Sequence, residues 1–313
     1  MYAALREFFR RQAYVEVETP SLVRFAGMEP QIRPFEVWFH PEMKFGEPRR
    51  WYLHTSPEYA MKRLLGEGFG AIFQLGKVFR NGEISRLHNP EFSLLEFYRP
   101  DADYRVIMAE LESALSEGCV RVGRDLFFSR LPYQRVTVHQ AVKQYAEIDL
   151  AECPDVTSLR AAALSRSIHI GEATTFEDLF FHIFLQRVEP NLGNARPTFL
   201  VDYPASMASL SRLKPGDSTL AERFELYAKG TELANGFSEL TDVSEQRRRL
   251  IEEQAWRQAH GKEPIELDEL FLKGVAQMPP SAGVAVGIDR VLMLMVGASS
   301  IDEVLLFPAS QFQ

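Results

Sequence analysis

Two alternating stretches joined by a charged loop, residues 71–80 and 91–98, constrain the fold more than any other part of the sequence. In the first stretch the apolar side chains recur at every second position, while Arg80 falls on the opposite face. In the second stretch, one face carries Phe92, Leu94, Glu96 and Tyr98. A surface hairpin with a solvated loop would alternate in the same way. The row of an aromatic ring, an acid and a phenol favours instead two paired strands that line a pocket.

Composition and charge exclude several classes of protein. The chain has 313 residues, 46% hydrophobic and 25% charged, which is ordinary for a globular enzyme, and we expect one domain with at most an insertion. No run approaches the ~20 apolar residues of a membrane span and no leader-like segment opens the chain, so we expect a cytoplasmic protein. Cys119 and Cys153 are too few for a disulfide framework or a cysteine metal site. The net charge of −8 argues against a broad nucleic-acid surface.

The rest of the chain alternates between helical and strand patterns. Residues 2–12 predict an amphipathic helix, and a strand over 14–20 ends at a proline, which places it at a sheet edge where a partner subunit could lie. Residues 21–50 show no clear period, and we expect an exposed loop over 42–50. Further helices are expected over 59–65, 102–117 and 246–260, strands over 51–54, 198–202, 221–228 and 231–240, a strand-to-helix passage over 136–145, and a small helical insertion over about 149–195.

Two acids in the predicted strand 231–240 are candidate ligands for a cation. Glu232 and Glu239 are seven positions apart, so a regular strand would point them to opposite faces of its sheet. The Asn235-Gly236 pair is typical of a break or bulge, which would bring both acids to one side. We therefore expect the strand to be irregular at residue 236, since a regular strand there would remove the argument for paired acids.

A run of small residues completes the candidate site. Gly283, Ala285 and Gly287 occupy one strand face and leave room for a flat ligand. Arg290 follows near a helix start, where its charge opposes the helix dipole, which suggests that it serves a ligand. Arginines suit phosphate, carboxylates suit Mg²⁺ or an amine, and a ring such as Phe92 suits adenine. Because the sequence contains no P-loop, nucleophile elbow or zinc-binding helix motif, the chemistry should depend on positioning and charge.

These segments together resemble the three signature motifs of class II aminoacyl-tRNA synthetases. Residues 16–20 resemble motif 1, residues 79–98 motif 2 and residues 283–290 motif 3. With residues 55–58 and 232–239, the chain is similar to the lysyl-tRNA synthetase catalytic domain over nearly its whole length. The resemblance implies an α+β fold in which helices flank an antiparallel sheet, and a homodimer built through motif 1. It also implies that motifs 2 and 3 hold ATP in a bent form.

The resemblance implies a role for each matching residue of the nucleotide site. Arg80 would contact the α-phosphate of ATP, while Phe92 and Arg290 would sandwich the adenine ring. Glu232 and Glu239 would hold the Mg²⁺ that accompanies ATP. Further nucleotide contacts would come from Asn81, Gly82, Asn89, the Leu233 backbone and Gly287. Gly82 stands where the family usually has Glu, and this departure leaves its contact open.

The resemblance also implies an amino-acid site that includes carboxylates. Its members would be Ser56, Pro57, Glu58, Tyr98 and Glu239. Lysine and (R)-β-lysine carry ammonium groups that need carboxylate partners, whereas aspartate would need arginine. The acids therefore indicate a diamino acid as the substrate.

The acceptor of the activated amino acid is indicated by what surrounds the motifs. Lysyl-tRNA synthetases carry an N-terminal OB-fold domain that reads the anticodon, and here motif 1 begins within the first twenty residues, so we expect neither that domain nor anticodon recognition. Ala285 also stands where these synthetases typically place glycine. The chain thus most resembles the ligases that activate (R)-β-lysine with ATP and transfer it to a lysine of translation elongation factor P. The alternatives are a stand-alone lysyl-tRNA synthetase-like enzyme charging tRNA and a catalytically silent nucleotide-binding module.

Overall fold

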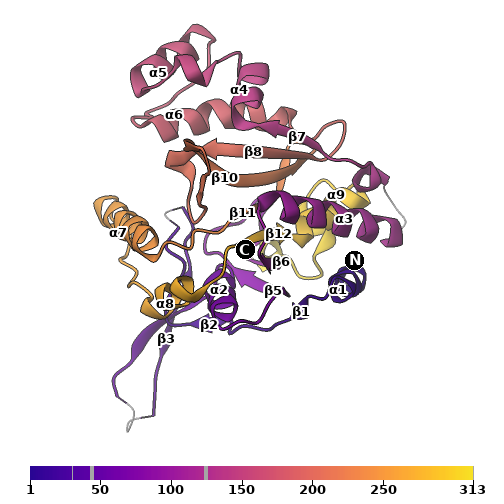
Figure 1. The fold of residues 1–313 in the computed structure, drawn as a ribbon, viewed down its shortest axis with the longest axis vertical. Coiled ribbons are helices and arrows are strands. Elements are labelled where there is room, and N and C mark those ends of the chain that lie inside the picture. The colour runs from indigo at the N-terminus through magenta and orange to yellow at the C-terminus, as the bar shows by residue number, and fades with distance from the viewer. Residues whose placement is uncertain (30, 43–45, 123–125, 313) are drawn as a thin grey trace.

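A large central sheet organises the chain in the computed structural model (Figure 1). The structure describes residues 1–29, 31–42, 46–122 and 126–312. Within these residues the sheet has nine strands, in the order β1-β5-β6-β12-β11-β10-β8-β7 with β9 paired to β10. Its middle strands are antiparallel, whereas β1 runs parallel to β5 and β7 parallel to β8. The strands are β1 Val15–Glu16, β5 Ile72–Phe79, β6 Glu91–Pro100, β7 Gln134–Thr137, β8 Thr198–Pro204, β9 Leu213–Lys214, β10 Asp217–Ala228, β11 Thr231–Ser238 and β12 Ser281–Gly287.

The predicted hairpin lies within this sheet, and its alternation separates a core face from a site face. Strands β5 and β6 pair from Ile72 opposite Tyr98 to Phe79 opposite Glu91, and β6 pairs on its other side with β12. The core face packs against three helices: α1 Tyr2–Arg11, α3 Tyr104–Val122 and α9 Ile288–Val296. The largest hydrophobic cluster fills this space, which confirms a sheet flanked by helices.

Three further helices border the opposite face of the sheet. Helix α2 Glu58–Gly66 packs on β5 and β6, and it also contacts α8 Glu269–Gln277, which in turn lies beside α7 Val243–Ala259. The rings of Tyr59 and Phe271 stack with centroids 4.0 Å apart and tie α2 to α8. These helices leave the middle of the site face uncovered.

A helical layer packs beyond the far end of the sheet, at the top of Figure 1. It contains α4 Val138–Ala146, α5 Val156–Ser165 and α6 Phe176–Ile183, which continues as a π-helix over Phe184–Val188. Its apolar residues form a cluster of their own with β7 and β8. Helices were predicted here, although α4 joins the same cluster from outside the predicted range of 149–195. Short 3₁₀ helices cover Leu126–Ser129, Leu150–Glu152, Glu189–Asn191, Ala205–Met207, Ile301–Val304 and Ala309–Phe312.

The aperiodic residues 21–50 contribute to a second sheet that the sequence did not reveal. Its three strands in the described residues have the order β2-β4-β3, with bounds Leu22–Val23, Arg49–Leu53 and Phe35–Phe39. Most side chains of β2 and β3 are at least partly exposed, so no hydrophobic alternation marks these two strands. Strand β4 covers most of the strand predicted over 51–54. The loop predicted over 42–50 falls partly on 43–45, which lie outside the described residues, and it was wrong for Arg49 and Arg50, which begin β4.

Strand β11 is regular where an irregularity was predicted. Its pairing with β12 runs from Ala234 opposite Val286 to Ser238 opposite Ala282 without a shift, so the break at Asn235-Gly236 was wrong. Gly236 is small for a packing reason instead, because a Cβ there would lie 2.6 Å from both the Phe224 ring and the Gly283 carbonyl oxygen.

Strand β11 does have a bulge, at Leu233, three residues before Gly236. This bulge still brings Glu232 and Glu239 to one face. Leu226 pairs with Ala234 while Tyr227 pairs with Glu232, so Leu233 is the extra residue on β11. One extra residue reverses the alternation. Glu232 therefore joins Asn235, Phe237 and Glu239 on the site face.

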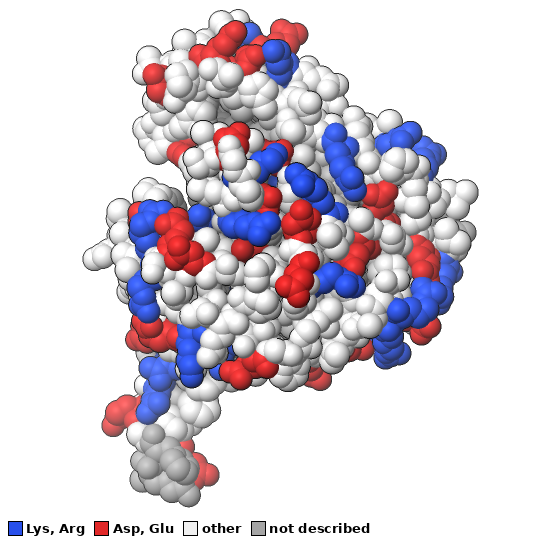
Figure 2. All heavy atoms as spheres, in the orientation of Figure 1, with Lys and Arg blue, Asp and Glu red and all other residues white. Residues whose placement is uncertain are grey.

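The surface carries both signs of charge. On the face shown in Figure 2, Lys and Arg side chains alternate with Asp and Glu side chains rather than forming one broad basic area. Within the described ranges, none of the helices combines the length and the apolar character that crossing a bilayer would require.

Candidate active site

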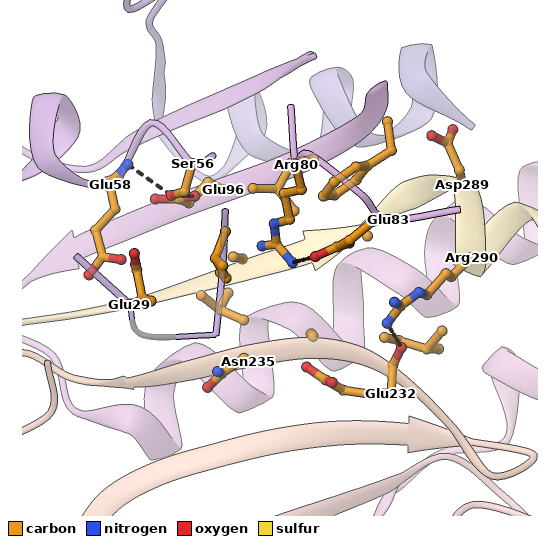
Figure 3. Close-up of a pocket in the computed structure, with 18 of the residues that line it drawn as sticks. Glu29, Ser56, Glu58, Arg80, Glu83, Glu96, Glu232, Asn235, Asp289 and Arg290 are labelled. Atoms are coloured by element: carbon orange, nitrogen blue, oxygen red, sulfur yellow. Dashed lines mark hydrogen bonds and ion pairs between the residues drawn. The ribbon is translucent and has the colours of Figure 1, made fainter. Parts of the chain in front are cut away.

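One cavity collects most of the residues predicted for the site. It lies on the site face of the central sheet and has a volume of about 1140 Å³, part of which is open to solvent. The predicted residues that line it are Ser56, Glu58, Arg80, Asn89, Phe92, Tyr98, Glu232, Leu233, Glu239, Gly287 and Arg290. Because they come from β6, β11, β12, α2, α9 and adjoining loops, only the folded sheet brings them together (Figure 3).

Three predicted residues are not among the residues that line this cavity. Pro57 caps the start of α2, beside the cavity rather than in it. The Asn81 backbone N–H donates to the Arg33 carbonyl oxygen at 2.7 Å, which fixes the loop after β5. Gly82 adopts a φ of +85° with open space around its Cα, so its glycine serves the turn.

Arg80 lies at the end of β5 with one donor unused. Its backbone N–H donates to the Pro90 carbonyl oxygen at 2.8 Å, and its guanidinium carbon lies 5.1 Å from the centroid of the Phe92 ring. Glu83 approaches the guanidinium at 4.0 Å. The Nε atom is shielded from solvent and has no hydrogen-bond partner in the structure. A buried donor without an acceptor is costly, so this atom is suited to an anionic ligand.

Arg290 is held by three contacts at the opposite wall of the cavity. It donates to the carbonyl oxygens of Glu232 at 3.0 Å and Leu87 at 3.2 Å. Its third contact is to Nε2 of His88 at 2.6 Å, while Nδ1 of His88 lies 2.7 Å from the Ser85 hydroxyl. Burial and the Arg290 charge lower the pKa of His88, which favours a neutral ring that accepts from Arg290. The guanidinium plane is therefore fixed before any ligand arrives.

The neighbouring Asp289 anchors the start of α9 to the hairpin. Its carboxylate accepts a hydrogen bond from the Ser93 backbone N–H at 2.7 Å. This bond ties β6 to the helix that carries Arg290. This hydrogen bond therefore links the segments that resemble motif 2 and motif 3.

Glu232 and Glu239 have different neighbours. The pKa of Glu232 rises to about 7 because it is buried and faces Glu225, while Arg290 and Arg223 oppose the shift. Glu239 instead contacts Lys62, whose ammonium lies 2.6 Å from its carboxylate. The structure places both acids on one face but not in one pair. Among the described residues no group of three potential ligands is arranged to hold a metal ion.

Lys62 is a buried cation that the sequence analysis missed. It is 1% exposed, and its ammonium lies 2.6 Å from both Glu58 and Glu239. Burial disfavours its charge, but these two carboxylates overcome that effect and hold the pKa of Lys62 above its usual value. Glu58 and Lys62 are four residues apart on α2, so their helical pairing was visible in the sequence. Lys62 joins α2 to the end of β11.

Glu96 is another buried acid, and it lines the same cavity as Glu58 and Glu239. It accepts hydrogen bonds from the Ser56 hydroxyl at 2.8 Å and the Tyr98 hydroxyl at 2.6 Å. Burial, followed by the nearby charge of Glu58, raises the pKa of Glu96 to about 8. Burial, opposed by Lys62 and aided by Glu58, also raises the pKa of Glu239 to about 8. Such acids gain from a cationic ligand, because its positive charge replaces the solvation that burial has removed and stabilises the ionised carboxylate.

Two other acids in the cavity lacked a strong sequence signal. Glu29 lies in the aperiodic segment before β3, and no motif marks it. Glu83 follows Gly82 in the charged loop and faces Arg80. The departure at Gly82 was the available hint that the adjacent acid takes a position in the cavity.

The small residues of β12 serve two separate purposes. A Cβ on Gly283 would lie 2.2 Å from the Tyr98 ring, so this glycine makes room for Tyr98 rather than for a ligand. A Cβ on Gly287 would meet nothing closer than 3.8 Å, so this position is open toward the cavity. The prediction that the whole run clears space for a flat ligand was therefore wrong at Gly283.

Comparisons with known proteins identify the family. The sequence matches the class II tRNA synthetases (D, K and N) over residues 1–311. It is 40% identical over 310 residues to a protein of Salmonella paratyphi B (strain ATCC BAA-1250 / SPB7) named elongation factor P–(R)-β-lysine ligase, and 41% identical over 310 residues to a Klebsiella pneumoniae (strain 342) protein of the same name. Each match covers 97% of this chain and 91% of the relative. The chain therefore belongs to the class II tRNA synthetase family, in the group of the elongation factor P–(R)-β-lysine ligases, and is an enzyme of the ligase class.

Proposed function

We propose that this enzyme activates (R)-β-lysine with ATP and transfers the β-lysyl group to a lysine side chain of translation elongation factor P. The observation that carries the proposal is the division of one cavity into two ends with opposite needs. The Arg80 end has a buried donor without an acceptor. The other end holds buried acids, and Lys62 forms ion pairs with only two of them, Glu58 and Glu239. ATP and a diamino acid satisfy both ends.

The first step forms the adenylate without a nucleophile from the protein. A carboxylate oxygen of β-lysine attacks the α-phosphorus of ATP, the bond from that phosphorus to the bridging oxygen breaks, and pyrophosphate leaves with the electron pair. Arg80 donates to the phosphate oxygens that gain charge, and Arg290 with Phe92 holds the adenine. In the second step the neutral amine of the acceptor lysine attacks the acyl carbon, AMP departs, and the amine proton passes to solvent.

A magnesium ion is expected with ATP, and the residues present allow it in part. Glu232 lines the cavity near Arg290 and offers a carboxylate, and Mg²⁺ commonly takes one or two carboxylates together with substrate phosphates. Glu239 fits less well as a metal ligand, because its carboxylate already forms an ion pair with the Lys62 ammonium. When bound, the ion would neutralise phosphate charge. We propose instead that Glu239 stays at the amino-acid end of the cavity, where it neutralises Lys62 beside the substrate.

Replacing Arg80 by Ala tests the nucleotide end. Pyrophosphate exchange dependent on (R)-β-lysine should fall by about 10²–10³-fold, as when one charge-stabilising donor is lost. Arg86→Ala is the matched control, since Arg86 is exposed in the same loop and donates to the Ser299 carbonyl oxygen outside the cavity. The control should keep its exchange rate. An Arg80→Ala enzyme with an unchanged rate would contradict the phosphate role.

A transfer experiment separates the proposed acceptor from the alternatives. The enzyme is incubated with ATP, labelled (R)-β-lysine or lysine, and either elongation factor P or tRNA. Label should appear on elongation factor P. Label on tRNA alone would favour the tRNA-charging alternative, and failure to form an adenylate with any diamino acid would favour a silent nucleotide-binding module.

We further propose that the 313 residues work as one catalytic domain with a helical insertion over about 149–195, and as a homodimer in the cytoplasm. The dimer is supported by two features. Strand β1, which carries the start of motif 1, is the edge of the sheet, and Val15 on it is 49% exposed. The second feature is a groove lined by Tyr2, Phe35 and Phe79, which also includes the exposed apolar residues Leu306 and Phe307.

A further inference from the structure

We propose that Glu29 binds the substrate ammonium group nearer to the reacting carboxylate and thereby helps to select (R)-β-lysine over α-lysine. The inference rests on the proposed function and adds a specificity role for a loop residue outside the three motifs. Glu29 lines the cavity together with Ser56 and Glu58. In Figure 3 its carboxylate lies beside that of Glu58 and faces into the space above the sheet.

Glu29 has an unmet need for a donor. Its Oε2 atom is shielded from solvent and has no hydrogen-bond partner in the structure. Burial, followed by the charge of Glu58, raises the pKa of Glu29. A shielded carboxylate in this state is stabilised by a cationic ligand that donates hydrogen bonds.

The protein's own cation does not meet that need. Lys62 lies 2.6 Å from Glu58 and 2.6 Å from Glu239, so its ammonium is committed to those two carboxylates. Of the four acids at this end of the cavity, Glu29 and Glu96 are the two for which the described residues show no ion pair with Lys62. Two remaining carboxylates match the two ammonium groups of a diamino acid.

The two remaining acids belong to different parts of the fold, and on this basis we assign them to different ends of the substrate. Glu96 belongs to β6 on the floor of the cavity, and its partners are Ser56 and Tyr98. Glu29 comes from the loop above, and Arg80 is among the charges that act on it. The ammonium at the far end of the substrate therefore suits Glu96, and the ammonium near the carboxylate suits Glu29.

The two lysines differ in the position of the ammonium group nearer to the carboxylate. In (R)-β-lysine this group sits one carbon farther from the carboxylate than in α-lysine. A carboxylate on a separate loop can meet the displaced group while the sheet residues keep the far end unchanged. Specificity then arises from pairing one substrate's ammonium and leaving the other's poorly paired.

Glu29→Gln tests this role with three substrates in the pyrophosphate exchange assay. The KM for (R)-β-lysine should rise about tenfold, as expected for loss of one charge-assisted contact, with kcat changed less than about twofold. The KM for α-lysine should rise less. The KM for 6-aminohexanoate, which has no amine near its carboxylate, should not change. Equal losses for all three substrates would show a structural role and overturn the inference.

Glu253→Gln is the matched control. Burial and the charge of Glu29 raise the pKa of Glu253 to about 7, but this acid on α7 is not among the residues that line the cavity. The control should keep the wild-type ratio between (R)-β-lysine and 6-aminohexanoate. If the wild-type enzyme fails to exchange pyrophosphate with every diamino acid tested, the proposed function itself fails. If it does exchange and Glu29→Gln leaves the ratio unchanged, only the role of Glu29 falls.

Discussion

At the scale of single residues, burial disfavours the ionised form of two carboxyl groups in the cavity. Glu96 and Glu239 both have pKa values raised to about 8, chiefly by burial. Above the ordinary pKa of glutamate, the unliganded folded protein therefore keeps protons on Glu96 and Glu239 that the unfolded chain has released. A diammonium ligand reverses this, because its charges favour the ionised acids. Substrate binding and proton release are thus coupled at this site.

This coupling predicts a pH dependence with a definite sign. Between about pH 4.5 and 8 the folded protein binds more protons than the unfolded chain, so the free energy of unfolding should fall as the pH rises through that window. Glu96→Gln should make this fall shallower by about one proton's share. Chemical denaturation at several pH values measures the slope. Glu266→Gln, at a side chain 78% exposed, should keep the wild-type slope.

The same residues predict proton release on binding. At pH 7 calorimetry in buffers of different ionisation enthalpy should show protons leaving as (R)-β-lysine binds, and fewer should leave from Glu96→Gln. Proton uptake on binding, or equal release by both proteins, would contradict the assignment of these acids to the substrate.

At the scale of elements, strand β12 supports both ends of the cavity through residues without side chains. Gly283 lies opposite Tyr98 on β6 and opposite Phe237 on β11, so a side chain there has nowhere to go. Gly287 is the last residue of the strand and borders open space. Two glycines in one strand thus have separable roles.

Substituting each glycine by Ala should separate these roles. Gly283→Ala places a Cβ 2.2 Å from the Tyr98 ring, so it should lower the free energy of unfolding by about 1–3 kcal/mol and raise the KM for (R)-β-lysine. Gly287→Ala should leave thermal stability nearly unchanged and raise the KM for ATP. Thermal unfolding and substrate titrations of both variants check this. The same pattern from both variants would contradict the division.

At the scale of the whole molecule, the exposed apolar residues near the C-terminus predict where two copies meet. Leu306 is 90% and Phe307 is 78% exposed, beside the groove that includes Tyr2. Replacing both Leu306 and Phe307 by Asp should convert a dimer into a 35.7 kDa monomer in analytical ultracentrifugation. Leu164→Asp, at a residue 57% exposed on α5, should leave the dimer intact. A monomeric wild-type protein would contradict the dimer.

The sequence by itself determined the nature of the hairpin and most of the candidate site. Strict alternation placed Phe92, Glu96 and Tyr98 on one face, because side chains of a strand alternate regardless of what surrounds it. Arg80 was selected because alternation places it on the open face, and Arg290 because its charge opposes the dipole at a helix start. Resemblance to the synthetase motifs then indicated the family that the comparisons show.

Only the tertiary structure decided the contacts that depend on distant segments. The bulge at Leu233 follows from pairing with β10, so local residues such as Asn235-Gly236 could not locate it. Gly283 is small because Tyr98 lies across from it, and Lys62 meets Glu239 across 177 positions of the chain. Glu29 reaches the cavity from a segment without period. In each case the deciding neighbour is close in space and remote in sequence, which local patterns do not encode.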